Sequence, residues 1–244
     1  MKMEKRENQY RNPPLQEVIA EFQFWAGRPD PTVPGMMYEK VKGRYPDKKI
    51  ATAFSIHMDV VEGKIHQEIE PVFYRARFIS KDGKAILQVA PDYLSIHRLS
   101  PYPSWKVFRE EVGESLETFV AISELNRYKQ ISLRYINILD FPPTELEKYL
   151  TYYLKIPNFL REKFQDSAVL SSFAFSDKGS LRIHTFSQQG KTFLTFEYFY
   201  RNLDEVSLEE VKRMLDEAHD IIKGTFESII TDKARKIFEQ EGKI

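Results

Sequence analysis

Cysteine is absent from this chain of 244 residues, and its absence excludes several classes of protein at once. Disulfide-stapled scaffolds, cysteine-based zinc sites, iron–sulfur clusters and thiol nucleophiles all depend on cysteine. Any catalysis must therefore use histidine, carboxylates, hydroxyl groups or lysine.

Glycine is scarce, with ten residues, and the glycine-rich motifs that bind phosphate through the backbone are missing. The chain has no Gly-x-x-x-x-Gly-Lys loop, no Gly-x-Gly-x-x-Gly fingerprint and no Gly-x-Ser-x-Gly nucleophile elbow. With so few glycines, backbone cradles for phosphate are scarce.

An excess of charge of one sign and a long apolar run are lacking too. The 36 lysines and arginines balance 36 aspartates and glutamates, which argues against general nucleic-acid binding because nucleic-acid binders carry a basic excess. No window approaches the roughly 18 apolar residues of a membrane span, and the charged start lacks the apolar centre of a secretory signal. We expect a cytoplasmic protein with no membrane segment and a disordered tail at residues 1–9.

What the chain does contain is one order of secondary structure, which the apolar patterns predict twice: strand, short helix, several strands, long helix. In the first half the predicted strands span 14–25, 50–61, 74–80, 85–89 and 93–99, and the predicted helices 34–44 and 105–126. In the second half the strands span 130–141, 168–175, 180–187 and 192–200, with a short helix after Pro143 and a long helix from residue 208. Ser104 is the expected N-cap of the first long helix, Ser207 with Glu210 forms a capping box at the second, and Thr144 with Glu147 is a second possible capping box.

These elements predict an α+β fold in which antiparallel strands, in one sheet or two, pack against long helices. The repeated order indicates pseudo-duplicated units at residues 10–126 and 127–244. Because no linker rich in proline, glycine or serine separates the units, residues 10–244 are expected to form a single compact domain.

Histidines are the natural general bases and metal ligands of a chain without cysteine. His97 and His184 lie on predicted strands, one in each half. With Arg182 they would serve a metal-independent phosphodiesterase or nuclease, one histidine removing a proton and the other donating one. The serine that follows each histidine is three residues on, which places it on the opposite strand face. The two-histidine phosphoesterase pattern is therefore not met, and polar histidines on ordinary strands are the favoured interpretation.

His219 lies on the final predicted helix beside Asp216 and Asp220, but no second histidine or glutamate stands at metal-ligand spacing on that helix. A capping or interhelical hydrogen bond is the expected role. We expect neither a metal site nor a cofactor.

Arginines on predicted strands form the candidate anion site. They are Arg75 and Arg77, which share one strand face, Arg134 on the strand that opens the second half, and Arg182 on the strand of His184. Convergence of these guanidinium groups would bind phosphate or carboxylate bidentately. Cross-strand pairing with Glu68, Glu70 or Glu197 would neutralise them instead, and this is the plainer alternative.

The aromatic strand at residues 192–200 completes the candidate site. Alternation places Phe196, Tyr198 and Tyr200 on one face and Phe193 and Phe199 on the other. One face is expected to be core, and the other a ligand groove, a dimer interface or the underside of the long helix. Tyr198 is the predicted aromatic contact of the ligand, against the plainer interpretation that it packs in the core.

Four segments together resemble a sporadically distributed family of uncharacterised prokaryotic proteins. They are Tyr10-Arg11-Asn12-Pro13-Pro14-Leu15-Gln16-Glu17-Val18, then Pro101-Tyr102 with Trp105 and Phe108, then Leu133-Arg134-Tyr135-Ile136-Asn137, and finally Ala218-His219 with Phe226, Ile230 and Thr231. The similarity covers nearly the whole chain. It implies a cytoplasmic prokaryotic protein with a link to defence-associated genes, and it carries over no catalytic residue.

The leading functional hypothesis is a non-catalytic binding or accessory module for an anionic small molecule or a partner protein. It depends on the lack of a complete catalytic constellation together with the strand arginines and aromatics. The phosphodiesterase or nuclease described above is the first alternative. A structural homodimer sealed by the long final helix is the second.

Overall fold

The computed structural model describes residues 10–27, 29–61, 64–188 and 190–239, and within them it forms one antiparallel sheet of nine strands. The strand order is β2-β3-β4-β5-β1-β6-β9-β8-β7. The strands are β1 (Leu15–Phe24), β2 (Asp47–Val61), β3 (Lys64–Ile79), β4 (Ala85–Ala90), β5 (Tyr93–Leu99), β6 (Arg127–Leu139), β7 (Asp166–Ala174), β8 (Gly179–Gln188) and β9 (Lys191–Glu205). The predicted α+β class is confirmed, and the sheet is continuous rather than divided in two.

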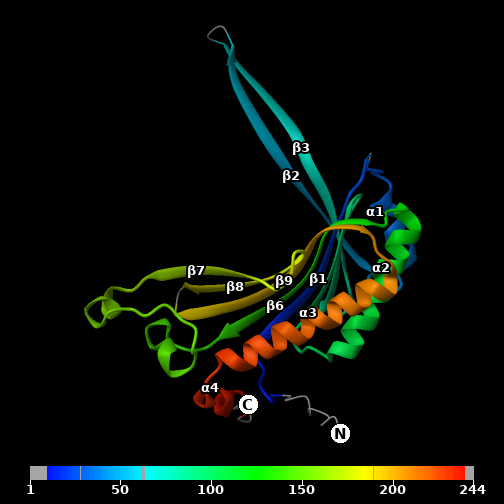
Figure 1. The fold of residues 1–244 in the computed structure, drawn as a ribbon. Helices are drawn as coiled ribbons and strands as arrows, with labels where there is room; N and C mark the ends of the chain where they lie inside the picture. The colour runs from blue at the N-terminus through cyan, green and yellow to red at the C-terminus, as the bar shows by residue number, and fades with distance from the viewer. Residues whose placement is uncertain (1–9, 28, 62–63, 189, 240–244) are drawn as a thin grey trace.

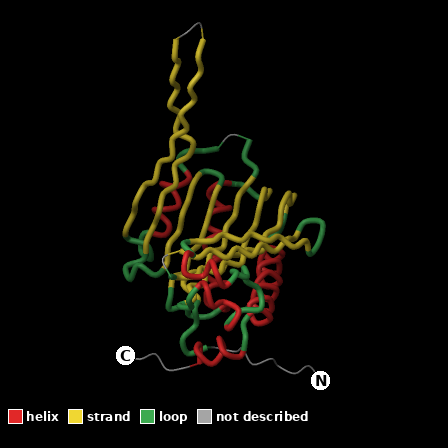
Figure 2. The backbone as a smooth tube through the Cα atoms, turned by 90° about the vertical axis from the view of Figure 1, so that its left-hand side faces the viewer, coloured by secondary structure: helices red, strands yellow, loops and turns green. Residues whose placement is uncertain are grey.

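Helices cover one face of this sheet (Figure 1). They are α1 (Val33–Val41), α2 (Trp105–Ser123) and α3 (Leu208–Ile229), with α4 (Asp232–Glu239) beyond the end of α3. The short 3-10 helices η1 (Pro143–Lys148) and η2 (Asn158–Lys163) lie in the connection from β6 to β7. Viewed from the side, the strands form one twisted layer with the helices beside it (Figure 2).

The hydrophobic core lies between the sheet and α1, α2 and α3, because strand residues alternate between the two faces. Along β1, Val18, Ala20 and Phe22 are buried in this core, whereas Glu17 and Glu21 point to the other face. The predicted helix seams supply the opposite wall. Its members are Phe108, Val112, Leu116 and Phe119 of α2, with Val211, Leu215, Ala218 and Ile222 of α3.

The two halves of the chain meet at the centre of the sheet, where β1 pairs antiparallel with β6. Residues 10–126 supply β1 to β5, and the second half supplies β6 to β9, with β5 flanking β1 and β9 flanking β6. Both halves contribute to the same core cluster. Duplication of the two halves stays a prediction, and the predicted tail at residues 1–9 lies outside the described residues.

The β2–β3 hairpin reaches well beyond the rest of the sheet (Figure 1). Strand β4 pairs with β3 only from Ala76 to Ile79, although β2 and β3 pair along their whole lengths. The remainder of the hairpin is therefore a two-stranded ribbon. The first part of β3, residues 64–73, was not among the predicted strands.

The expected caps form in two cases out of three. The Ser104 side chain accepts a hydrogen bond from the Val107 N–H at the start of α2, and Ser207 accepts from the Glu210 N–H at the start of α3. The predicted capping box at Thr144 is wrong, because Pro142 occupies the N-cap position and no side chain caps η1. The predicted long helix from residue 208 is confirmed as α3, and a separate short helix, α4, follows it.

Among the described residues, none of the helices combines the length and the apolar character needed to cross a membrane.

Candidate functional site

The predicted arginines and histidines lie on the sheet face away from α1, α2 and α3. We call this the open face and define it by the row His97, Ile19, Arg134, Glu197 and Arg182, which the strand register places side by side on β5, β1, β6, β9 and β8. His184 is two residues from Arg182 and shares its face, as alternation predicts. Arg75 also faces this side, with its guanidinium 3.7 Å from the centre of the Tyr93 ring.

The structure does not bring His97 and His184 together. Strands β1, β6 and β9 lie between their strands, which is about 19 Å along the sheet at roughly 4.8 Å per strand. His97 is 7% exposed, and its Nδ1 lies 2.7 Å from the Glu17 carboxylate while its Nε2 lies 2.8 Å from the Ser95 hydroxyl. His184 is exposed and lies on β8, at the opposite end of the row from His97.

Nor do the four arginines converge on one point. Arg134 and Arg182 donate to the two oxygens of Glu197, at 2.5 and 2.9 Å, and Glu197 is only 5% exposed. The plainer alternative, cross-strand pairing of the arginines with a glutamate, is therefore what the structure shows for Arg134 and Arg182. Arg75 and Arg77 are on β3, and three strands lie between β3 and β6.

Tyr198 lies on the opposite face from the arginines. Its side chain is 1% exposed in the core, with its ring centre 5.1 Å from that of Tyr200. The aromatic ring that meets Arg182 is the neighbouring Phe199, whose centroid is 4.9 Å from the guanidinium. Strand alternation correctly placed Tyr198 and Phe199 on different faces. The predicted ligand contact was Tyr198, which is the buried one of the two.

A cavity of about 280 Å³ opens on the helix side of the sheet. It lies between α3, the first turn of α2, the start of β1 and the end of β6. Six aromatic residues line it, namely Tyr10, Tyr102, Trp105, Tyr135, Phe196 and Phe226, together with the polar residues Ser104, Asn137, His219, Lys223 and Glu227.

The same cavity collects the four segments that carry the family resemblance. Pro13 and Pro14 come from the first segment and Tyr102 to Trp105 from the second. The third segment, on β6, supplies Tyr135 and Asn137. The fourth, on α3, supplies His219 and Phe226. Segments that are far apart in the chain thus meet at one place.

Trp105 forms one wall of the cavity and is fixed on two sides. Its ring is stacked on His219, with centroids 4.4 Å apart and planes within 3°. Its indole N–H donates to Asp216 at 2.9 Å, and Arg109 donates to the other oxygen of this carboxylate at 3.0 Å. His219 Nδ1 in turn lies 2.6 Å from the Tyr135 hydroxyl. His219 thus joins α3 to strand β6, rather than capping a helix or bonding to a second helix as the sequence predicted.

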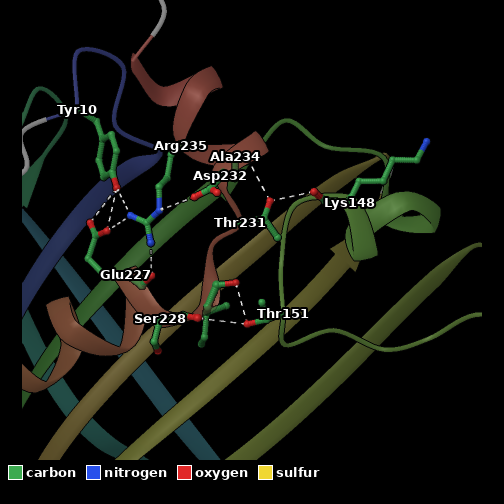
Figure 3. Close-up of polar contacts among 10 residues, drawn as sticks. Tyr10, Lys148, Thr151, Glu227, Ser228, Thr231, Asp232, Ala234 and Arg235 are labelled. Atoms are coloured by element: carbon green, nitrogen blue, oxygen red, sulfur yellow. Dashed lines mark hydrogen bonds and ion pairs between the residues drawn. The ribbon is translucent and has the colours of Figure 1, made fainter.

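Tyr10 closes the other end of the cavity through a cluster that joins the two ends of the described chain (Figure 3). Its hydroxyl lies 2.9 and 3.0 Å from the Glu227 carboxylate oxygens and accepts from Arg235 of α4 at 2.8 Å. Arg235 also pairs directly with Glu227. Burial, followed by the hydrogen bond to Glu227, raises the pKa of Tyr10 to about 12. We call Tyr10, Glu227 and Arg235 the clasp.

Charged side chains of both signs surround the cavity. The two nearby carboxylates, Asp216 and Glu227, are each paired with an arginine, Arg109 and Arg235 respectively. Lys223 adds a further positive charge to the lining. The cavity also adjoins the N-terminal end of α2, where the helix dipole favours negative charge.

Sequence reasoning passed over this cavity, although one signal was present. His219, Lys223 and Glu227 recur every four residues on α3, next to the apolar seam. Such spacing places three polar side chains in a line along one helix face. The other walls come from distant segments, which no local pattern links.

The described residues contain no group of three or more histidine, aspartate or glutamate side chains placed to hold a metal ion. Comparison with protein-family models and with curated proteins found no match for the chain. The fold and the cavity thus define an α+β protein with an aromatic recess of small-molecule size that Lys223 helps to line.

Proposed function

We propose that this protein is a non-catalytic binding module whose cavity takes a small, planar, anionic molecule. The observation that carries the proposal is the cavity itself, where six aromatic side chains surround a space next to Lys223. We also propose a cytoplasmic setting. A link to defence-associated genes depends on the family resemblance alone.

The shape and lining of the cavity suit a flat ring. Its volume, about 280 Å³, is close to the lower end of the range of about 300 to 1,000 Å³ typical of small-molecule sites. Aromatic walls favour planar groups, because offset-stacked and edge-on ring contacts are more favourable than burial of the same area alone. A polymer would need a longer groove, so a single small molecule fits better.

The charge of the ligand follows from the surroundings. Lys223 lines the cavity, while the nearby carboxylates Asp216 and Glu227 are already bound to arginines. An anionic group in the cavity lies next to the ammonium of Lys223 and gains an attractive interaction there. The first turn of α2 adds to this preference.

The existing contacts support binding rather than catalysis. His219 is stacked on Trp105 and bonded to Tyr135, and Asp216 holds Trp105 and Arg109. These bonds fix the positions of the cavity walls. Preorganised walls reduce the entropy cost of binding a ligand.

The experiment uses Trp105 as its own reporter. The chain has two tryptophans, and the Trp25→Phe variant leaves Trp105 as the single one. Native mass spectrometry of the purified protein first reports any molecule retained from the cell. Trp105 fluorescence is then followed during titration with benzoate as an anionic planar probe and benzamide as its neutral counterpart.

We expect benzoate to change the Trp105 emission and benzamide to act at least about tenfold more weakly, since one favourable charge interaction in a partly enclosed site contributes about 1.4 kcal/mol or more. Lys223→Met should abolish the difference between the two probes. Lys212→Met on the same helix, whose ammonium is paired with Glu209, should preserve it. A protein that retains no molecule and responds to neither probe would contradict the proposal.

A further inference from the structure

Asn137 is a polar residue in a row of core positions on β6. The alternate residues Leu133, Tyr135 and Leu139 belong to the hydrophobic core, and Asn137 shares their face with an exposed fraction of 4%. A buried carboxamide normally makes its hydrogen bonds inside the protein. Asn137 also lines the cavity, so any bond that the protein does not supply is open to a ligand.

The amide nitrogen of Asn137 is already engaged. Its Nδ2 donates to the Leu194 carbonyl on β9 at 3.0 Å, and the two residues are cross-strand partners. A carbonyl oxygen only accepts hydrogen bonds, so the nitrogen of the carboxamide, and not its oxygen, faces Leu194. This contact fixes the orientation of the carboxamide group.

The amide oxygen of Asn137 has no such partner. A carboxamide oxygen can accept two hydrogen bonds, yet in the part of the chain that the structure describes no N–H or O–H group donates to Oδ1. The residue is buried on its other sides. The cavity is therefore the space from which a donor reaches this oxygen.

Aromatic rings stand next to this acceptor. Tyr135 precedes Asn137 by two residues on the same face of β6, and Phe196 is the cross-strand partner of Tyr135 on β9. Both rings line the cavity together with Asn137. The polar atoms of a heterocycle lie at the edge of its ring, so a ring packed against aromatic walls keeps these atoms available for hydrogen bonds.

We propose that the ligand of this cavity is a nitrogen heterocycle whose ring N–H donates to Oδ1 of Asn137, and that Asn137 distinguishes this ligand from other planar anions. The inference rests on the proposed function and narrows it to one class of ring. A site that hydrogen-bonds an N–H group discriminates strongly against an analogue without the donor. Such an analogue displaces water from the cavity and leaves a buried acceptor unpaired.

The test uses two aromatic carboxylates that differ in one ring atom. Pyrrole-3-carboxylate has a ring N–H where furan-3-carboxylate has an oxygen, and the two anions are alike in charge and shape. Binding is followed by the fluorescence of Trp105 in the Trp25→Phe protein, excited at a wavelength that neither probe absorbs. We expect pyrrole-3-carboxylate to bind roughly tenfold more tightly than furan-3-carboxylate.

Two variants in the same background assign this preference to Asn137. Asn137→Leu keeps a side chain of similar size without the amide, and it should bring the ratio of the two dissociation constants to about one. Asn158→Leu makes the same change at an exposed position of η2, outside the cavity, and should keep the ratio. Circular dichroism checks the fold of both variants, and the ratio measured with Asn137 intact tests the proposal even if N137L does not fold.

The outcomes separate this inference from the proposed function. Equal affinities of the two probes with Asn137 intact would overturn the inference and leave the binding of planar anions standing. A tenfold preference that persists in N137L would also overturn it, because another group would then accept from the ring N–H. If benzoate and both of these carboxylates fail to bind, the proposed function fails and the inference fails with it.

Discussion

The clasp offers a prediction that links the two ends of the chain to the cavity. Tyr10→Phe removes one hydroxyl and leaves the ring, which packs against Phe226 and Phe238 with centroids 6.4 and 5.6 Å away. The lost bonds join Tyr10 to the charged groups of Glu227 and Arg235. We expect the effect to be local, because the hydroxyl of Tyr10 meets α4 at Arg235.

The magnitude follows from the number and exposure of these bonds. Hydrogen bonds to charged groups contribute about 1.5 to 3 kcal/mol each when buried. The side chains of Arg235 and Glu227 are 28% and 23% exposed, so solvent screening reduces the sum, and we expect a loss of about 1.5 kcal/mol in the free energy of opening of α4. This corresponds to about a tenfold change in the opening equilibrium.

Native-state hydrogen exchange measures this opening directly. In Y10F, the amides of α4 should exchange about tenfold faster, whereas those of α2 should be unchanged. Thr151→Val, which removes a hydroxyl that donates to the Ile229 carbonyl at the end of α3, outside the clasp and α4, serves as a control for general loosening of this end. Equal acceleration in α2 and α4, or no change in α4, would refute the argument that the clasp holds α4 against the cavity.

Two further predictions concern the open face. Glu197→Gln should lower the free energy of unfolding by about 2 kcal/mol in urea titrations, because it leaves Arg134 and Arg182 without their carboxylate. The two arginine side chains are about one third exposed, so solvation recovers part of the loss. An unchanged midpoint would show that the ion pairs of Glu197 contribute nothing to stability. Burial, and then the charge of Glu21, raises the pKa of Tyr93 to about 12, so this phenol adds stability that is complete below pH 10 and is lost as the pH rises towards 12. Glu21→Gln should lower the pKa of Tyr93 in an ultraviolet titration and flatten that alkaline loss, and an unmoved titration curve would rule out the role of Glu21.

Local patterns predicted most of the elements, because their causes are local. The seam of α2 from Phe108 to Phe119 has the 3.6-residue spacing of a helix packed on one side. The turn between β3 and β4 contains Asp82-Gly83, and Gly83 has the positive φ of 70° that such a turn requires. These features depend on a few neighbouring residues.

The assembly of the sheet depends on contacts that no local pattern contains. The pairing of β1 with β6 joins residues more than a hundred positions apart, and it decides that there is one sheet rather than two. The early part of β3 was missed because its sequence mixes charged residues with Pro71, which weakens the strand pattern.

The candidate residues show the same limit. Alternation correctly placed Arg182 and His184 on one face, but it could not show that Glu197 lies between Arg182 and Arg134. The cavity is further removed from local patterns, since Tyr10, Trp105, Tyr135 and His219 reach it from four separate segments of the chain. The family resemblance pointed to the segments that contain these residues, but only the fold shows that the segments meet at one cavity.

The closeness of the two ends of the described chain has a consequence for its connectivity. The Asn12 N–H donates to the Phe238 carbonyl at 2.8 Å, so a short linker could join the two ends without moving either. Cutting the joined chain between α2 and β6 would give a circular permutant in which the second half precedes the first. Every strand pair of the sheet, including β1 with β6, is compatible with that order, so the order in which the halves are synthesised is not itself a requirement of the fold.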